Sequence, residues 1–176
     1  QKAGIEDCHT LTTMTDNAEF ILSVCPPHDA QSVAVSVAEL NFNGIFVDCN
    51  AISPQKSRQL SQQLNESRYV DGGIIGGPAW DADSGTRLYL SGEKAKATAE
   101  LFQESPLHVT VISGDIGAAS AMKMVFAAYT KGTTALLAAI LGVAEREGIR
   151  DVLESQWGES FTSRTHNQLV TNSSKA

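Results

Sequence analysis

Residues 45–54 read IFVDCNAISP and pass from a strand to a helix within ten residues. Residues 45–48 form a short apolar run that closes on an aspartate, which predicts a strand. Ser53 then offers a side-chain oxygen as an N-cap, and Pro54 occupies the first helical position, where a missing N–H does no harm. The stretch therefore indicates an α/β protein in which a helix, predicted to reach about Leu64, directly follows the strand.

Upstream of this stretch the same alternation is present. Residues 20–25 (FILSVC) are continuously apolar and are stopped by two prolines, which predicts a strand buried on both faces in a parallel sheet. Residues 29–40 follow as an amphipathic helix that packs back on the sheet. Three apolar side chains share the face of this helix that we expect to be buried: Val33, Val37 and Leu40.

Downstream, residues 69–71 form a third strand, which runs into the glycine-rich stretch 72–78 (GGIIGGP). Glycine and proline at this density predict irregular backbone that can approach a ligand closely. A strand at 88–90, a helix at 93–102 and a strand at 108–112 complete the alternation.

After the last strand the pattern becomes helical. No proline occurs within 117–147, and apolar residues recur at helical spacing, which predicts one long helix followed by a shorter one at 150–157. Strands first and helices later predict an α/β domain, residues 1–114, joined near Gly114 to a helical domain, residues 115–176.

The bulk composition argues against several classes of partner. Of the 176 residues, 42% are hydrophobic and 19% are charged, as in ordinary globular proteins. The net charge is −7, with 13 Lys and Arg against 20 Asp and Glu, and no basic stripe could neutralise phosphates, so we expect no nucleic-acid partner. The longest apolar run, residues 135–144, is half the ~20 residues that a membrane span needs. We expect it to be a buried helix segment, with no membrane partner.

The cysteines and histidines form no ligand pattern. Three cysteines lie far apart without a C-x-x-C pair, and four histidines are scattered, so we expect neither a disulfide framework nor a metal site. A reducing cytoplasm is the expected compartment. The first residues lack both a Met and the layout of a secretory signal, which indicates a truncated chain rather than a targeted one.

Three segments follow predicted strands directly. They are residues 24–27, residues 48–54 and the glycine-rich stretch 72–78. In open parallel sheets, ligands bind at the carboxyl ends of the strands, where such loops lie. Each segment alone can be explained as turn chemistry, but three in succession favour a shared cleft.

Lys123 is the only charged residue between Asp115 and Lys131. Helical spacing places it on one face with Ala127, Thr130, Lys131 and Thr134, in an otherwise small and apolar helix start. A lysine held among apolar neighbours can exchange protons near neutrality, so Lys123 is a candidate general acid/base. The alternative is a solvated lysine on a domain surface.

Three motifs occur in order along the chain: D-x-N-A-x-S-P at 48–54, D-G-G-I-I-G-G-P at 71–78 and G-x-x-x-x-x-K at 117–123. In this order they resemble the β-hydroxyacid dehydrogenase family, which includes 3-hydroxyisobutyrate and 6-phosphogluconate dehydrogenases and the imine reductases. The resemblance extends from about Phe20 to the C-terminus. It implies a partial Rossmann-like doubly wound sheet followed by an all-α domain similar to the C-terminal domain of 6-phosphogluconate dehydrogenase.

In this family the helical domain usually dimerises, so the resemblance implies a homodimer of the intact protein. The chain is most similar to members in which the helical region carries a domain of unknown function, here beginning near residues 172–176. The first phosphate-binding βα unit, with its G-x-G-x-x-G turn, has no counterpart in the chain, and the helical domain is incomplete. We therefore expect this chain by itself to bind cofactor poorly and to be inactive.

The resemblance also assigns roles to residues. Lys123 would be the catalytic acid/base in hydride transfer between a nicotinamide and the substrate. The positions that would lie along the cofactor, NADP or NAD with NADP slightly favoured, are Val24, Cys25, Pro26, Asn50 and Ala51. The positions that would contact the small-molecule substrate are Ile75, Gly76, Gly77 and Ala127.

Several positions depart from the family pattern. Ile75 stands where the family usually has serine, and Ala127 stands where it usually has asparagine. Thr130 and Lys131 replace the acidic and tyrosine residues that phosphogluconate enzymes use, so a 6-phosphogluconate substrate is not expected. An apolar pocket suited to a bulkier hydroxyacid, carbonyl or imine substrate is expected instead. Its possible lining residues are Ile74, Ile75, Trp80, Phe126 and Tyr129.

Two functions stay open on the sequence. The first is an NAD(P)-dependent dehydrogenase or reductase. The alternative is a non-catalytic dinucleotide-binding or dimerisation module derived from this fold. A phosphate cradle at the glycine-rich loop is less favoured, because no lysine or serine follows the glycines.

Overall fold

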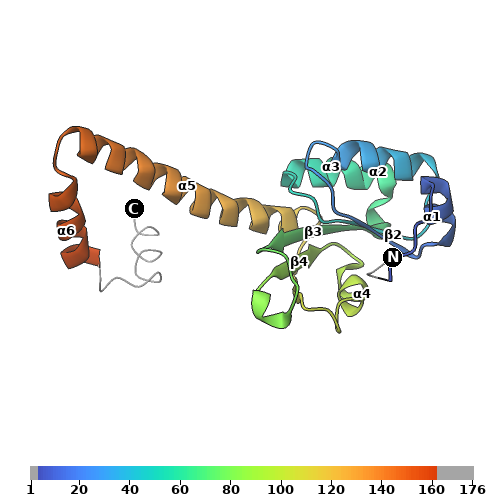
Figure 1. Ribbon diagram of the computed structural model, residues 1–176. Coiled ribbons are helices and arrows are strands. Elements are labelled where there is room, and N and C mark those ends of the chain that lie inside the picture. Colours follow the sequence, from blue (N-terminus) through green and yellow to red (C-terminus); the bar gives the residue numbers. More distant parts are fainter. Residues whose placement is uncertain (1–3, 162–176) are drawn as a thin grey trace. The chain divides into compact units, whose positions relative to one another are not determined.

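The computed structural model describes residues 4–161 of the chain (Figure 1). It divides into two compact units, Gln1–Ala127 and Ala128–Ala176. The division falls inside the long helix α5, Ala118–Arg146. The predicted onset of a domain of unknown function near residues 172–176 lies outside the described residues.

The first unit is built on a five-stranded sheet in the order β1-β2-β3-β4-β5. The strands are β1 Phe20–Ser23, β2 Ile45–Asp48, β3 Tyr69–Ile75, β4 Arg87–Ser91 and β5 His108–Val111. β1, β2 and β3 are parallel, β4 is antiparallel to β3, and β5 is parallel to β4. The carboxyl ends of the first three strands therefore share one edge of the sheet.

Helices cover both faces of this sheet (Figure 1). The helices of the first unit are α1 Leu11–Asn17, α2 Ala30–Glu39, α3 Pro54–Leu64 and α4 Ala95–Glu100, with 3-10 turns at Glu66–Arg68 and Ala82–Ser84. α2 and α3 bury apolar side chains against Phe46 and Tyr69 on one face. α4 packs against Val47 and Val70 on the other face. The predicted doubly wound α/β arrangement is confirmed.

Most of the predicted elements are present within a few residues of their expected bounds. β2 has the predicted limits, and the Ser53 hydroxyl accepts a hydrogen bond from the Lys56 N–H at 3.2 Å, as an N-cap does. The long helix and the shorter one, α6 Arg150–Phe161, confirm a helical C-terminal region. The helix predicted at 93–102 is shorter, and α1 was not predicted.

The glycine-rich stretch 72–78 was predicted to be irregular, which is wrong for residues 72–75 and right for residues 76–78. β3 continues through Gly72 and Gly73 to Ile75, because β4 runs antiparallel beside it and pairs with it along five residues from each strand. Interstrand hydrogen bonds offset the conformational cost of ordering glycine in a strand. The sheet is for the same reason mixed rather than purely parallel.

Three predictions of burial also need correction. β1 is buried on one face only: Ile21 is 6% exposed but Leu22 is 49% exposed. Ile21 faces the core under α2 and α3, whereas α4, on the other face, packs at β3, β4 and β5. In α2 the buried residues are Ala30, Ala34 and Val37, while Leu40 is 37% exposed beyond the helix end.

The third correction concerns the apolar run 135–144, which was predicted to be buried. Within it only Ala144 is buried, and Leu136 is 61% exposed. Among the described residues, α5 is the one helix long and apolar enough to cross a membrane by length and composition, a test that core helices of other proteins also pass. The apolar side chains of this run are therefore largely exposed among the described residues.

The predicted domain limits, 1–114 and 115–176, stay a prediction. The predicted boundary near Gly114 falls just before α5, whereas the compact units divide after the tenth residue of that helix, Ala127. Ala119 and Ser120 are fully buried, so the first turns of α5 belong to the core of the first unit.

Candidate functional site

Asn50 ties the carboxyl ends of β1 and β2 together. Its side chain is 2% exposed; the amide nitrogen donates to the Ser23 hydroxyl at 2.9 Å, and the amide oxygen accepts from the Cys25 N–H at 2.6 Å. Its own N–H donates to the Asp48 carboxylate at 2.9 Å. These bonds fix the backbone at the start of the segment that contains Val24, which is 62% exposed.

The residues predicted to lie along the cofactor are therefore brought together. Ser23 pairs with Asp48 in the parallel register, so the loops after these two strands leave the same edge. Val24 and Pro26 are exposed there, while Cys25 and Ala51 are partly buried. The buried side chain of Asn50 holds these loops, and this holding role was not foreseen from the sequence.

Thr86 shapes the loop that follows β3. Gly76 has φ +134°, and a Cβ on it would lie 2.6 Å from the Thr86 hydroxyl oxygen, so glycine is required for both conformation and space. The Thr86 hydroxyl donates to the Gly77 carbonyl at 2.7 Å. A Cβ on Gly77 would meet nothing within 4 Å, so the backbone there is accessible. Sequence reasoning missed Thr86, whose one signal was its place just before a strand.

Lys123 lies against β3. A Cβ on Gly73 would come within 2.7 Å of the Ala119 carbonyl oxygen and 3.3 Å of the Lys123 Cβ. Only glycine allows α5 to approach the strand this closely. Gly73 stands two residues before Ile75, so the structure brings Lys123 to the carboxyl end of β3, beside the loop predicted to bind substrate.

The charge of Lys123 influences the pKa of Cys49, which directly follows β2. The pKa of the Cys49 thiol is raised to about 12, first by burial and then by the nearby carboxylates of Asp48 and Asp71, while Lys123 acts in the opposite direction. Lys123 therefore lies near the ends of both β2 and β3.

A buried polar network runs beneath this edge of the sheet. The Tyr69 hydroxyl donates to Asp48 at 3.1 Å, and the Ser57 hydroxyl lies 3.2 Å from the Tyr69 oxygen and 2.9 Å from the Asp71 carboxylate. Burial raises the pKa of Asp48, although hydrogen bonds from Asn50 and Tyr69 oppose the shift. Burial, followed by the charge of Asp48, likewise raises the pKa of Tyr69.

The remaining predicted residues lie at different levels of exposure. Ile74, Ile75 and Ala127 are partly buried, whereas Trp80 is 87% exposed and Phe126 is 44% exposed. Tyr129 belongs to the second unit. The predicted apolar lining thus includes residues of both units, and the site residues stay predictions.

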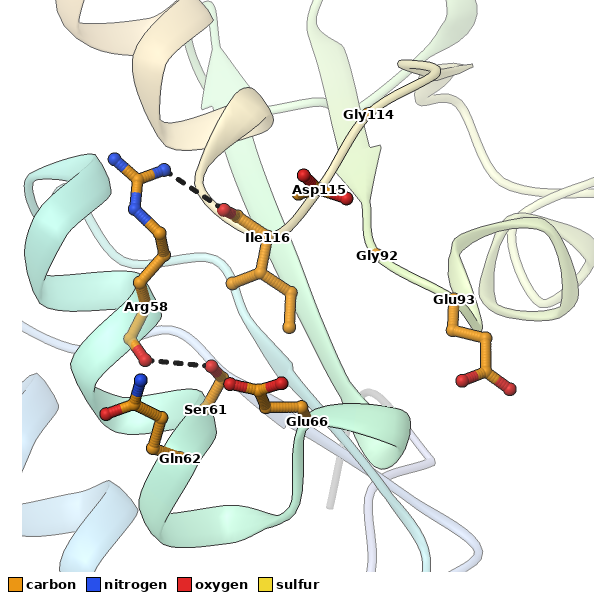
Figure 2. Close-up of a pocket in the computed structure, with 9 residues that line it drawn as sticks. All are labelled: Arg58, Ser61, Gln62, Glu66, Gly92, Glu93, Gly114, Asp115 and Ile116. Atoms are coloured by element: carbon orange, nitrogen blue, oxygen red, sulfur yellow. Dashed lines mark hydrogen bonds between the residues drawn. The ribbon is translucent and has the colours of Figure 1, made fainter.

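A separate cavity of about 460 Å³ lies near the opposite edge of the sheet (Figure 2). Arg58 of α3 donates to the Ile116 carbonyl at 3.1 Å beside it. Gly92 lines it and follows Ser91, which pairs with Asp71 in the first half of β3. None of the residues predicted from the sequence lines this cavity, so it is distinct from the candidate site.

No cluster of His, Cys, Asp or Glu within the described part of the chain is arranged to hold a metal ion. The candidate site is instead an edge at which three parallel strands end, with exposed loop backbone and one half-buried amine. This arrangement can bind an extended ligand and exchange a proton with it.

No family model matches the chain. It is 26% identical over 174 residues to an uncharacterised 28.5 kDa protein in the 7S RNA 5′ region of Methanothermus fervidus, covering 97% of this chain and 67% of that protein. It is similar, at TM-score 0.72 and 26% identity, to a conserved protein of unknown function whose structure is similar to 3-hydroxyacid dehydrogenases; the match covers 88% of this chain and 58% of that one.

An imine reductase from Myxococcus stipitatus, in complex with NAD⁺, is similar at TM-score 0.67 and 19% identity, covering 94% of this chain and 61% of that one. The resemblance inferred from the three motifs is thereby confirmed: the chain has the fold of the 3-hydroxyacid dehydrogenase-like and imine reductase NAD(P)-binding proteins. The chain spans about three fifths of the length of these solved structures.

Proposed function

We propose that this chain is part of an NAD(P)-dependent oxidoreductase of the β-hydroxyacid dehydrogenase type, with Lys123 as its general acid/base. The observation that carries the proposal is the packing of Lys123 on Gly73, at the strand end that leads into the Ile75–Gly77 loop. In an oxidoreductase fold, a half-buried amine at the carboxyl edge of the sheet is placed where a substrate would meet the cofactor.

The residues at this edge fit the nicotinamide end of such a cofactor. Val24 is exposed beside the Asn50 bonds, and the backbone of Gly77 has open space around it. We assign cofactor contacts to Val24, Cys25, Pro26, Asn50 and Ala51. When bound, the nicotinamide would accept or deliver the hydride; NADP is slightly favoured over NAD.

The role of Lys123 is to move one proton. As the substrate carbon loses its hydride, the neutral amine takes the proton of the substrate hydroxyl, which leaves a carbonyl. In the reverse direction the ammonium returns that proton to a carbonyl oxygen or an imine nitrogen. Backbone N–H groups of Gly76 and Gly77 would hold a substrate carboxylate, which a side chain there would block.

We propose a hydroxyacid, carbonyl or imine substrate and not 6-phosphogluconate. Ile75 and Ala127 stand at positions where the family uses polar side chains, so fewer groups are present to bind a phosphorylated polyol. A panel of these substrate classes, with 6-phosphogluconate included, tests this assignment by steady-state kinetics.

We also propose that the intact protein is a cytoplasmic homodimer formed through its helical region. The support is an apolar cavity of about 360 Å³ in the second unit. It is lined by Ala139, Ile140, Val143, Ala144, Ile149 and Leu153. Subunit interfaces between helices are usually formed by apolar surface that is exposed in the single subunit.

One observation favours the second candidate, a non-catalytic dinucleotide-binding or dimerisation module. Ala127 replaces the asparagine that usually follows the lysine by four residues in this family, and Ile75 replaces a hydroxyl donor to the substrate. This candidate predicts cofactor binding without turnover.

The test uses the full-length protein that contains this chain. NADPH and NADH are titrated by fluorescence, and turnover is measured for the wild type, Lys123→Ala and the control Lys131→Ala, which removes an exposed lysine farther along α5. Turnover lost only in Lys123→Ala supports the dehydrogenase. Binding with no turnover in any form supports the non-catalytic dinucleotide-binding module. No binding contradicts both the dehydrogenase and the dinucleotide-binding module.

A further inference from the structure

Asp71 is a buried carboxylate in β3 that gathers groups from three other elements. It is 1% exposed. It accepts hydrogen bonds from the Ser57 hydroxyl at 2.9 Å, the Ser91 hydroxyl at 3.1 Å, the Gly117 N–H at 3.0 Å, the Ser120 N–H at 2.9 Å and the Ser120 hydroxyl at 2.5 Å. Three of these five bonds come from the start of α5.

These bonds cap α5 from outside the helix. The first N–H groups of a helix have no partner within it and are normally satisfied by a side chain just before the helix. Here Asp71 of β3 accepts from Gly117 and Ser120, and the Ser91 hydroxyl of β4 accepts from the Ala119 N–H at 3.1 Å. A carboxylate at this end also complements the positive end of the helix dipole. The sheet itself therefore determines where α5 starts and how it is rotated.

The same face of β3 then meets the next turn of α5. Asp71 and Gly73 are two residues apart and point to one face of the strand, about 6.6 Å apart along it. Ser120 and Lys123 are three residues apart and lie on one face of the helix, a rise of about 4.5 Å. Asp71 bonds Ser120, and Gly73 packs against Lys123, so the two elements are held in register by these two contacts.

We propose that Asp71 is a positioning residue, which holds Lys123 at the carboxyl end of β3 by fixing the start and rotation of α5. The proposal rests on the proposed function in taking Lys123 as the acid/base. Asp71 itself is two residues before Gly73, and its carboxylate is occupied by hydrogen bonds from protein groups. It acts through the helix and not on the substrate.

The test compares variants that change the charge of Asp71 with variants that change the position of its carboxylate. Asp71→Asn removes the charge and presents an amide to two N–H donors, whereas Asp71→Glu keeps the charge but lengthens the side chain within a closed set of partners. Ser91→Ala removes the acceptor of the Ala119 N–H without altering any charge. The control is Asp48→Asn, which alters an equally buried carboxylate whose hydrogen-bond partners, Asn50 and Tyr69, lie outside α5.

Two readouts on the full-length protein do not need turnover. Amide hydrogen exchange in peptides covering residues 117–123 should accelerate by about fivefold or more in Asp71→Asn and Asp71→Glu, the factor that loss of a helix cap of about 1 kcal/mol corresponds to. Acylation of Lys123, followed by mass spectrometry, should change in rate in the same two variants. Ser91→Ala should show a smaller change in both, and Asp48→Asn should match the wild type.

Kinetics supply the third readout. In Asp71→Glu we expect kcat to fall by roughly tenfold or more, with the Kd for the nicotinamide cofactor unchanged, because a catalytic group has been displaced while the cofactor loops are intact. Wild-type exchange and acylation in both Asp71 variants would overturn the positioning role. If the wild type has no turnover but exchange and acylation respond as expected, the acid/base assignment fails while the placement of Lys123 by Asp71 stands.

Discussion

At the scale of single residues, burial next to the site raises the pKa of the Cys49 thiol. Cys49 is 3% exposed and lies against Gly72, where a Cβ would meet its sulfur at 2.5 Å. Burial and two carboxylates raise its pKa to about 12. Nearness to the proposed cofactor edge therefore does not make this thiol reactive.

We predict that Cys49 resists alkylation in the folded protein. At pH 8 a thiol with a pKa of about 12 is ionised in roughly one molecule in ten thousand, and only the thiolate reacts. Peptide mass spectrometry after iodoacetamide treatment at pH 8 should find Cys8 and Cys25, both partly exposed, modified before Cys49. All three should react in denaturant. Equal labelling of Cys49 and Cys25 in the native protein would contradict the burial.

We predict a pH-dependent effect of Asp48→Asn on stability. Burial raises the folded-state pKa of Asp48 above 3.8, so the folded state holds this proton more tightly than the unfolded state does. That stabilisation is complete below the unfolded pKa and is lost as the pH rises through the folded pKa. The asparagine variant has no proton to lose, so its stability relative to the wild type should increase from pH 4 to pH 7 in urea unfolding. A constant difference would show that Asp48 does not titrate in this way.

At the scale of secondary structure elements, the close approach of α5 to β3 depends on Gly73. A methyl group there would lie 2.7 Å from the Ala119 carbonyl, a backbone atom that cannot move without moving the helix. The loop at the end of β3 depends in turn on Gly76 and Thr86. Small residues at these points decide where Lys123 and the loop lie.

We predict that Gly73→Ala lowers the free energy of unfolding by about 1–3 kcal/mol, as overpacking does, and lowers turnover further by displacing Lys123. The matched control is Gly132→Ala in α5, the helix against which Gly73 packs. A Cβ on Gly132 would meet nothing within 4 Å. Replacing a helical glycine by alanine should be neutral or stabilising by up to about 1 kcal/mol. Denaturant unfolding of both variants tests the pair, and a shift of the same sign in both would contradict the packing.

We predict that Thr86→Val loosens the loop after β3. The change keeps the shape of the side chain but removes the donor to the Gly77 carbonyl, at a cost of about 1 kcal/mol. Because Gly76 and Gly77 are proposed to hold the substrate, KM for substrate should rise while Kd for cofactor does not. Ser84→Ala is the control, since its hydroxyl accepts only a 3.3 Å bond from the neighbouring Thr86 N–H. An unchanged KM in Thr86→Val would remove the loop from the substrate site.

At the scale of the whole molecule, the helical region carries apolar surface that its own unit leaves uncovered. Val143 is 53% exposed, Ile149 is 51% exposed and Val152 is 72% exposed. Large apolar patches on a folded surface usually mark an interface. The proposed homodimer would cover this surface in the intact protein.

We predict that Val152→Glu converts the proposed dimer of the full-length protein to monomer without unfolding it. Val152 is among the most exposed apolar residues, so a carboxylate is tolerated in the monomer but would be buried without a partner in an apolar interface. Light scattering after size exclusion measures the mass, and circular dichroism measures the fold. The control is Asp151→Glu, one position earlier on α6. A Val152→Glu protein that stays dimeric would place the interface elsewhere.

The sequence by itself determined the local features of this protein. Apolar runs, helix caps and glycine loops act within a few neighbouring residues, so the strands at 45–48 and 108–111, the Ser53 cap and the long helix could be predicted from the chain alone. Three motifs in order also indicated the family, and the isolation of Lys123 singled out one residue. The roles of the site residues stay predictions.

Only the tertiary structure decided the features that depend on distant residues. β4 pairs antiparallel with β3 and turns the glycine stretch into a strand, and Asp71 caps a helix that begins more than forty residues later. No local pattern marks such a pair, because hydrogen bonds between distant residues depend on the register of the whole sheet. The exposure of the apolar residues of α5 could not be predicted from the sequence for a related reason. Composition predicts that these residues will be covered, but not whether the chain itself or a partner covers them.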